Sequence, residues 1–214
     1  MTTPSPLNPP PATTGVVVHW AARYDLLVWL LTLGRERNFR ERLLEPARLQ
    51  PGESVLDVGC GTGSLALAAK RRVGPSGSAH GIDASPEMIA RARYKARKAK
   101  ADVTFENGVA EALPFSDARF DVVTSTVMLH HLRRDARQQG VREMKRVLKP
   151  GGRLLAVDFA GASQSGKGPL AHFHRHGHVR PGDLVDLVSD SGLRVVESGP
   201  LGIWALHFVL ADVR

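Results

Sequence analysis

The chain has 214 residues, of which 43% are hydrophobic and 23% are charged, enough to build one globular domain around a sizeable core. These values exclude a fibrous or largely disordered chain. No apolar run approaches the roughly 20 residues that cross a bilayer, and the N-terminus lacks the basic-then-apolar order of a secretory signal, so we expect a cytoplasmic protein.

An excess of basic residues leaves an anionic partner such as RNA open. The 29 Lys and Arg residues outnumber the 21 Asp and Glu residues and give a net charge of +8. Much of this charge lies in runs such as residues 91–100, where helical spacing favours a solvated face with few aromatic residues to stack on bases. The single cysteine, Cys60, excludes an internal disulfide and a cysteine-built metal site.

The chain is predicted to be one domain behind a short tail. Residues 1–14 hold five prolines and almost nothing to bury, so we expect a flexible Pro-rich tail over residues 1–17. The domain, residues 18–214, is predicted to have three parts: an N-terminal helical lid at 18–50, a ligand-binding core at 51–160, and a C-terminal substrate loop and edge hairpin at 161–214.

The N-terminal part begins with a strongly apolar helix. It runs from Trp20 to Leu33 and is expected to stop at Gly34, and a basic helix follows over about residues 35–45. Three interpretations of the apolar helix stay open. It packs on the core, which we favour, or it covers an active site, or it contacts a membrane surface.

A strand, a glycine-rich loop and a helix follow. The strand is Ser54–Val58, and the helix covers about residues 65–72. A second strand ends at Asp83, and Ser85 then supplies the N-cap of a helix that reaches about residue 99.

Strands and helices alternate through the rest of the chain. We expect strands at residues 103–106, 120–125, 153–158, 194–197 and 204–211, and helices at residues 135–148 and 183–191. Such alternation predicts an α/β fold, in which helices cover both faces of a parallel sheet and ligands bind at the carboxyl ends of the strands. The last two strands are close in sequence and are predicted to pair as an antiparallel hairpin at one edge.

The glycine loop, Asp57-Val-Gly-Cys-Gly-Thr-Gly63, is the first place where we expect chemistry. Its glycines let the backbone turn sharply and let a ligand approach the amides beside a helix N-terminus, where negative charge is favoured. Dinucleotide enzymes use a similar loop but require a small third residue, usually glycine or alanine, where this chain has Ser64. By itself the loop does not identify the ligand.

Two aspartates are expected to act with this loop. Asp83 ends the second strand, 20 residues after Gly63, where a carboxylate accepts hydrogen bonds from ribose hydroxyls; the alternative is a strand-end carboxylate or helix cap. Asp57 orients the loop or contacts the amino group of a bound amino acid moiety; the alternative is a purely structural role beside Val58.

Six motifs then follow one another across about residues 50–160. They are Val55-Leu-Asp-Val-Gly-Cys-Gly-Thr-Gly63, Gly81-Ile-Asp-Ala-Ser85, Ala110-Glu-Ala-Leu-Pro-Phe115, Phe120-Asp-Val-Val123, Leu129-His-His-Leu132 and Leu148-Lys-Pro-Gly-Gly152. Their order and spacing resemble those of class I S-adenosylmethionine-dependent methyltransferases. Upstream, Ala22-Arg-Tyr-Asp-Leu-Leu27 with Leu33-Gly34 resembles the ubiquinone and menaquinone C-methyltransferase group and related phospholipid N-methyltransferases.

The resemblance implies a fold, a cofactor and a set of binding residues. The fold is a Rossmann-like, seven-stranded, mostly parallel sheet with an antiparallel last strand, and the cofactor is S-adenosyl-L-methionine. The implied cofactor-binding residues are Tyr24, Asp57, Gly59, Cys60, Gly61, Asp83, Ala84, Met88, Val109, Ala110, Glu111 and Ser125. One departure stands out, because relatives often carry Asp where this chain has Val109, which removes an acceptor for the adenine amino group.

A general base is optional for methyl transfer from an activated donor, because positioning supplies much of the rate. If the acceptor must lose a proton, the candidates are His130, His131, His19 and Tyr24, and we select His130 and Tyr24 as the catalytic residues. Four alternating histidines suggest a metal when extended, but the run holds no carboxylate or cysteine, so we favour a substrate loop without metal. These histidines are His172, His174, His176 and His178.

The sequence therefore predicts a methyltransferase that acts on a small, lipophilic acceptor. A quinone precursor, a phospholipid head group or another metabolite fits this description, with peripheral membrane contact as a further expectation. Two alternatives stay open. One is an RNA methyltransferase that uses the basic surface, and the other is a protein that binds S-adenosylmethionine without catalysis.

Overall fold

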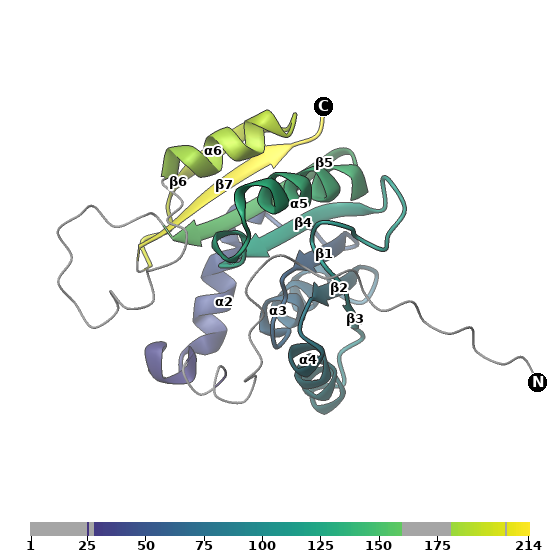
Figure 1. Ribbon diagram of the computed structural model, residues 1–214. Helices are drawn as coiled ribbons and strands as arrows, with labels where there is room; N and C mark the ends of the chain where they lie inside the picture. The colour runs from purple at the N-terminus through teal and green to yellow at the C-terminus, as the bar shows by residue number, and fades with distance from the viewer. Residues whose placement is uncertain (1–24, 26–27, 160–180, 204) are drawn as a thin grey trace, which may run out of the picture.

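The computed structural model describes residue 25 and residues 28–159, 181–203 and 205–214. Figure 1 shows strands and helices alternating along the chain. The strands are β1 (Ser54–Val58), β2 (Ser78–Asp83), β3 (Thr104–Asn107), β4 (Phe120–Thr126), β5 (Leu148–Phe159), β6 (Arg194–Pro200) and β7 (Leu206–Asp212). The helices are α2 (Glu36–Leu44), α3 (Ser64–Val73), α4 (Pro86–Ala99), α5 (Arg134–Val147) and α6 (Pro181–Asp190), with short 3-10 helices at Glu45–Ala47 and Leu129–His131.

The sheet has seven strands in the order β3-β2-β1-β4-β5-β7-β6. The first five of these are parallel, and β7 is antiparallel to both β5 and β6. The predicted Rossmann-like α/β fold and its antiparallel last strand are therefore confirmed. The predicted edge hairpin is present as well, since β6 pairs only with β7 and lies at the edge of the sheet.

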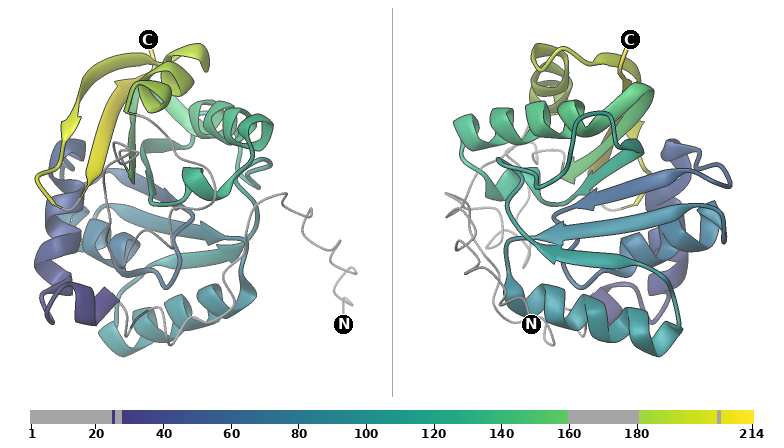
Figure 2. Two further views of the ribbon diagram at one scale, coloured as in Figure 1. Left: turned by 60° about the vertical axis from the view of Figure 1, so that its left-hand side comes forward. Right: turned by 90° about the vertical axis from the view of Figure 1, so that its right-hand side faces the viewer.

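Helices cover both faces of the sheet (Figure 2). On one face, α5 and α6 pack over apolar residues such as Leu56 and Leu154. On the other face, α2 and α3 pack over Val55 and Leu155. Because neighbouring residues of a strand point to opposite faces, the apolar pairs in β1 and β5 supply both cores at once. This double coverage leaves the strand ends as the place for a ligand.

Helix ends follow the predicted capping residues. Ser85 Oγ accepts a hydrogen bond from Met88 N at 3.3 Å and caps α4, with a proline at its first position. Gly34 has φ +74 and its amide donates to Trp29 O, which ends the helical turn at residues 28–31 where the sequence predicted a stop. Residues 20–24, 26 and 27 of the predicted apolar helix and the predicted tail lie outside the described residues.

The boundary between α5 and β5 differs from the prediction. The Lys149-Pro-Gly-Gly152 segment was expected as a turn before a strand at residues 153–158, whereas β5 already begins at Leu148. Leu148 pairs with Phe120, and the register shifts between Phe120 and Val122 before regular pairing resumes at Arg153. The turn residues therefore form an irregular part of the strand itself. Among the described residues, no helix is long and apolar enough to cross a membrane.

Candidate functional site

A cavity of about 130 Å³ opens at the carboxyl ends of β1, β2 and β4. Ten of the twelve predicted cofactor-binding residues line it: Asp57, Gly59, Cys60, Gly61, Asp83, Ala84, Met88, Val109, Ala110 and Glu111. The parallel register explains this convergence, because it sets Asp57 beside Gly81 of β2 and beside Thr124 of β4. Residues far apart in the sequence therefore meet at one edge of the sheet.

The glycine loop needs its glycines for two separate reasons. Gly59, Gly61 and Gly63 all have positive φ, a conformation that other residues rarely adopt. A Cβ on Gly63 would lie 2.6 Å from Phe105 Cζ of β3 and 2.8 Å from Ala92 Cβ of α4, so this glycine lets the start of α3 pack closely on both elements. A Cβ on Gly61 would meet nothing within 4 Å, so Gly61 instead presents open backbone to the cavity.

Asp83 connects the loop to β2 and faces the cavity. Its Oδ2 accepts from Gly61 N at 2.8 Å, and its Oδ1 accepts from Ser85 N at 2.9 Å. Burial raises the pKa of this carboxyl, and the two backbone hydrogen bonds act against that rise. Each carboxylate oxygen keeps further lone pairs, so Asp83 can also accept hydrogen bonds from a ligand's hydroxyls.

Asp57 and Arg40 place opposite charges in the same cavity. Asp57 is buried, its Oδ1 accepts from Thr124 Oγ1 at 2.8 Å, and its Oδ2 has no hydrogen-bond partner among the described residues. Burial raises the pKa of Asp57 to about 7, despite the hydrogen bond from Thr124 and the nearby charge of Arg40. Arg40 of α2 also has a buried Nε without a partner among the described residues. Such buried, unfinished polar groups mark a place for a ligand.

The loop after β3 also lines the cavity, through Val109, Ala110 and Glu111. Helix α5 fixes this loop from behind. Arg146 donates to Leu113 O at 3.0 Å, and Glu143 Oε2 accepts from Leu113 N at 2.9 Å. Val109 is buried and apolar, so it offers no side-chain acceptor at the position where the resemblance implies an acidic residue.

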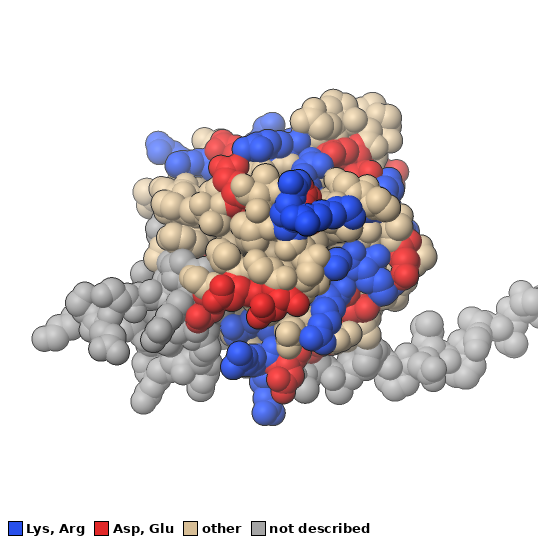
Figure 3. Space-filling view, turned by 90° about the horizontal axis from the view of Figure 1, so that it is seen from above, with Lys and Arg blue, Asp and Glu red and all other residues tan. Residues whose placement is uncertain are grey.

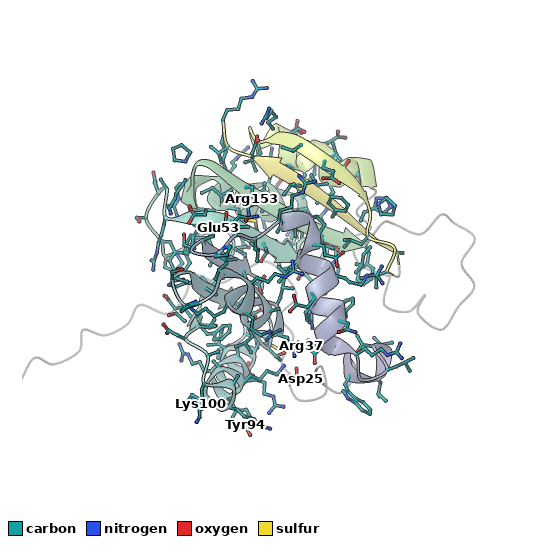
Figure 4. All side chains as sticks on the ribbon, turned by 180° about the vertical axis from the view of Figure 1, so that it is seen from behind. Asp25, Arg37, Glu53, Tyr94, Lys100 and Arg153 are labelled. Atoms are coloured by element: carbon teal, nitrogen blue, oxygen red, sulfur yellow. The ribbon has the colours of Figure 1, made fainter. Side chains whose placement is uncertain are left out.

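Asp25 ties the N-terminal segment to the glycine loop (Figure 4). Its Oδ1 accepts from Thr62 Oγ1 at 2.7 Å and from Lys95 Nζ at 2.6 Å, and its Oδ2 accepts from Arg91 Nε at 2.8 Å. Burial acts to raise the pKa of Asp25, but the hydrogen bonds from Lys95, Arg91 and Thr62 hold it below its usual value. Sequence reasoning missed this residue, although Asp25 follows the predicted Tyr24 directly.

His130 and His131 follow β4 in a short 3-10 helix. His131 lines the cavity, and its pKa is lowered to about 4, mainly by burial and then by the neighbouring His130. His130 does not line the cavity but packs against His131, with ring centroids 3.9 Å apart and ring planes tilted by 42°. Its Nδ1 lies 2.7 Å from Oδ1 of the buried Asp158, a partner that sequence reasoning did not identify.

The remaining predicted site residues are not brought to the cavity by the described structure. Ser125 is fully buried within β4 and precedes Thr126, which does line the cavity, so its cofactor role stays a prediction. Tyr24, His19 and the alternating histidines of residues 172–178 lie outside the described residues. The interpretation of that histidine run as a substrate loop therefore stays a prediction too.

Residues 55–152 match the family model of the methyltransferase domain. The matched segment begins in β1 and ends within β5. It contains the glycine loop, Asp83 and both histidines of the 3-10 helix.

Curated relatives come from quinone biosynthesis. The ubiquinone/menaquinone biosynthesis C-methyltransferase UbiE of Geobacter sulfurreducens is 39% identical over 142 residues, which are 65% of this chain and 55% of that protein. The demethylmenaquinone methyltransferase of Deinococcus radiodurans is 40% identical over 139 residues, 65% of this chain and 56% of that protein. The chain thus spans only a little over half the length of these relatives.

Solved structures support the fold. A SAM-dependent methyltransferase from Aquifex aeolicus superposes with a TM-score of 0.74 at 23% identity, covering 91% of this chain and 98% of that one. The [4+2]-cyclase SpnF superposes with a TM-score of 0.70 at 19% identity, covering 83% of this chain and 81% of that one. A methyltransferase and a cyclase thus share this architecture, so the fold alone does not fix the reaction.

Proposed function

Because the chain belongs to the class I S-adenosylmethionine-dependent methyltransferases, we propose that it transfers a methyl group from this cofactor to a small lipophilic acceptor. A quinone precursor is the leading acceptor class, since the curated relatives are named for ubiquinone and menaquinone biosynthesis. The observation that carries the proposal is the pairing of opposite charges in one cavity beside the glycine loop.

The cavity suits a ligand with a zwitterionic end. The guanidinium of Arg40 is complementary to a carboxylate, and the carboxylate of Asp57 with its unpartnered Oδ2 is complementary to an ammonium group. The amino acid moiety of S-adenosylmethionine carries both groups. Asp83 would then hold the ribose hydroxyls, and Met88 and Val109 would contact the adenine ring.

The bound cofactor supplies an activated methyl group on a positively charged sulfur. The protein's own residues orient the two reactants and exclude water. Asp57 lies near the end of β1 and Gly59 follows that strand, next to β4. The cavity-lining residues after β4 are Val127, Met128 and His131. We place the acceptor on this β4 side of the cavity, since the β2 side is taken by Asp83.

A lipophilic acceptor also fits the exposed apolar surface of the N-terminal segment. Trp29 and Leu30 are each 54% exposed and Leu33 is 84% exposed. The exposed basic residues Arg35 and Arg37 follow directly in the chain. Apolar side chains beside cations are typical of surfaces that contact anionic lipid.

Cofactor binding is tested by calorimetry with S-adenosylmethionine, S-adenosylhomocysteine and NAD. We expect micromolar affinity for the first two and none for NAD. Binding of NAD alone would overturn the proposal at its first step. Arg40→Met should lower the affinity for S-adenosylhomocysteine by about tenfold or more, because one charged hydrogen bond contributes about 1.5–3 kcal/mol.

Acceptor choice is tested with radiolabelled S-adenosylmethionine and vesicles that contain reduced demethylmenaquinone. We expect label in the quinone fraction, and a Leu30→Ser, Leu33→Ser double variant should bind the vesicles more weakly while keeping its cofactor affinity. Label on a water-soluble metabolite but never on lipid extracts would contradict the lipophilic acceptor.

An RNA acceptor is the second candidate, because the net charge is +8. On the face in Figure 3, however, acidic side chains lie between the basic ones, which argues against a continuous phosphate-binding surface there. Labelled RNA together with a steep salt dependence of RNA binding would favour this candidate. Binding of the cofactor with no methylated product would instead favour a non-catalytic binding protein.

A further inference from the structure

Asp158 holds His130 by two separate hydrogen bonds. Asp158 Oδ2 accepts from the His130 backbone amide at 2.9 Å, and Asp158 Oδ1 lies 2.7 Å from His130 Nδ1. Oδ1 also accepts from the Phe159 amide at 2.8 Å. Asp158 is only 1% exposed, so its carboxylate lies inside the protein.

The donors around Asp158 decide which nitrogen of His130 carries the proton. Two backbone N–H groups already donate to the carboxylate, so it acts as an acceptor toward the ring as well, and Nδ1 carries the hydrogen. Nε2 is then an unprotonated acceptor. It makes no hydrogen bond to another described residue, and the His130 side chain as a whole is 17% exposed.

Strand order places this pair next to the acceptor side of the cavity, where His130 packs against His131, which lines it. Along the sheet edge, Asp83 belongs to β2, Asp57 to β1, the histidines follow β4, and Asp158 belongs to β5. Val127, just before the 3-10 helix, sets the direction in which the chain leaves β4. This β-branched residue has φ +53, and its amide donates to Val157 O at 2.8 Å. A β-branched residue with this backbone conformation is a rare and strained feature, of a kind that clusters at functional sites.

Other titratable and charged groups surround the pair. They are His131 on the same 3-10 helix, Arg137 on α5, Asp183 on α6, and His207, which is paired with Asp158 across β7. Arg137 donates to the carbonyls of Leu129 and Leu132, so it clamps the 3-10 helix rather than the His130 ring. The carboxylate is therefore the one group among the described residues that contacts the Nδ1 side.

We propose that His130 is the proton acceptor of the reaction, with Asp158 as its positioning residue, and that it takes its proton from the O–H group of the hydroquinone acceptor named in the proposed function. This inference rests on the proposed function. The acceptor's O–H bond breaks and its proton moves to Nε2. The freed electron pair forms the new bond to the methyl carbon, through the oxygen or the conjugated ring carbon, while the carbon–sulfur bond breaks with its pair left on sulfur. On the oxygen route, the imidazolium then passes its proton to water. On the ring-carbon route, it returns that proton to the acceptor oxygen, and the methylated ring carbon loses its own proton to water, which restores the aromatic ring.

The tautomer is tested first, because this measurement needs no acceptor. Long-range proton–nitrogen spectra of the ¹⁵N-labelled full chain report which ring nitrogen of each histidine is protonated, and His130→Gln identifies the His130 signals. We expect Nδ1 protonated and Nε2 free, with Asp158→Asn mixing the two tautomers. A protonated Nε2 in the wild type would overturn the proposal.

Catalysis is tested with 1,4-naphthohydroquinone and with a more acidic chlorinated analogue. His130→Gln should lower kcat about 100-fold on the first acceptor while S-adenosylhomocysteine affinity changes less than twofold. The loss should shrink on the chlorinated acceptor and at high pH, because an acceptor that ionises by itself needs no base. If His130 were merely structural, the loss of kcat would be the same on both acceptors, whatever their acidity.

His80→Gln is the matched control, since His80 is also half-buried but lies outside the cavity and packs on Phe115 and Phe120. It should keep the wild-type kcat on both hydroquinones. Wild-type kcat in His130→Gln would overturn the inference. A wild type that binds S-adenosylhomocysteine but methylates neither hydroquinone would overturn both the acceptor class and the base, and failure to bind S-adenosylhomocysteine would overturn the proposed function itself.

Discussion

Asp121 and Asp57 lie on neighbouring strands but in opposite surroundings. At the amino end of β4, Asp121 accepts from Ser54 N, Ser54 Oγ and Lys149 Nζ. Burial acts to raise the pKa of Asp121, but these partners lower it to about 2. At the carboxyl end of β1, Asp57 has one hydrogen bond, and burial raises its pKa to about 7. The same residue type is satisfied at one end of the sheet and unsatisfied at the other.

The difference separates structural polar groups from groups that wait for a ligand. At the amino end, Arg153 makes two hydrogen bonds to Glu53, at 2.7 and 2.9 Å, and a third to Ala47 O (Figure 4). Such pairs complete one another and hold the strand ends together. At the carboxyl end, Arg40 and Asp57 keep unused hydrogen-bonding capacity inside a cavity. Unsatisfied buried groups cost stability, so their presence points to a bound partner.

Asp83→Ala should have the largest effect. We expect S-adenosylhomocysteine affinity to fall on the order of a thousandfold, because two hydrogen bonds to a carboxylate contribute about 1.5–3 kcal/mol each. Calorimetry measures the loss directly.

Asp121→Asn is the control from the opposite end of the sheet. It should leave the affinity unchanged and lower the Tm at pH 7 by a few degrees, since Asp121 holds Ser54 and Lys149 but lies away from the cavity. The Tm difference from wild type should disappear as the pH falls through about 2, where the native carboxylate becomes protonated. Equal losses of affinity in Asp83→Ala and Asp121→Asn would show that the carboxyl and amino ends of the sheet do not differ in ligand binding.

Asp57→Asn should raise the thermal stability of the protein and lower its affinity for the cofactor. The folded-state pKa of about 7 lies above the ordinary value of 3.8, so the folded state binds this proton more tightly than the unfolded state. Ionisation therefore destabilises the fold as the pH rises from 4 to 7. We expect Asp57→Asn to raise the Tm by about 5 °C at pH 8, with the gain shrinking toward pH 4, while cofactor affinity falls.

Thermal unfolding of both proteins across this pH range checks the expectation. Thr124 Oγ1 can still donate to the amide oxygen of the variant, so the comparison isolates the charge. A Tm difference that stays constant from pH 4 to pH 8 would show that Asp57 does not titrate as described.

Local signals in the sequence were sufficient for most of the fold. The run Ser54–Val58 was predicted to the residue, because a short apolar strand is bounded by a turn and by glycines. The Ser85 cap and Pro86 likewise fixed the start of α4. The start of β5 was not predictable, because Pro-Gly-Gly favours a turn and only pairing with Phe120 draws Leu148 into the sheet. Such pairing across the sheet has no local signature.

The same limit applies to the site. Gly59, Gly61 and Asp83 were found because their motifs are contiguous in the chain. Arg40 was missed because only the packing of the whole chain brings its side chain to the cavity, and Asp158 was missed because its partner is far away in the sequence. In the sequence, nothing distinguishes Asp158 from other strand residues. Its 2.7 Å contact with His130, which lies 28 positions earlier in the chain, exists only in the folded protein.

Asp25→Asn tests whether the N-terminal segment supports the binding edge. The variant weakens the hydrogen bonds to Thr62, Lys95 and Arg91 and loosens the glycine loop through Thr62. We expect about a tenfold loss of S-adenosylhomocysteine affinity, the equivalent of one or two ordinary hydrogen bonds. Glu41→Gln is a matched control, because Glu41 ties α2 to Arg72 of α3 away from the loop. Equal affinities in the two variants would contradict a specific role for Asp25.

Val109→Asp should have the smallest effect and is the one change expected to improve binding. Val109 lines the cavity at the position where the family resemblance implies an acceptor for the adenine amino group. A new carboxylate gains that hydrogen bond but must be buried, since Val109 is only 5% exposed, and desolvation cancels much of the gain. We therefore expect affinity for S-adenosylhomocysteine to rise about threefold, with Val109→Asn as the uncharged control. Unchanged affinity in both variants would mean that the adenine amino group is already satisfied by the loop that carries Ala110 and Glu111.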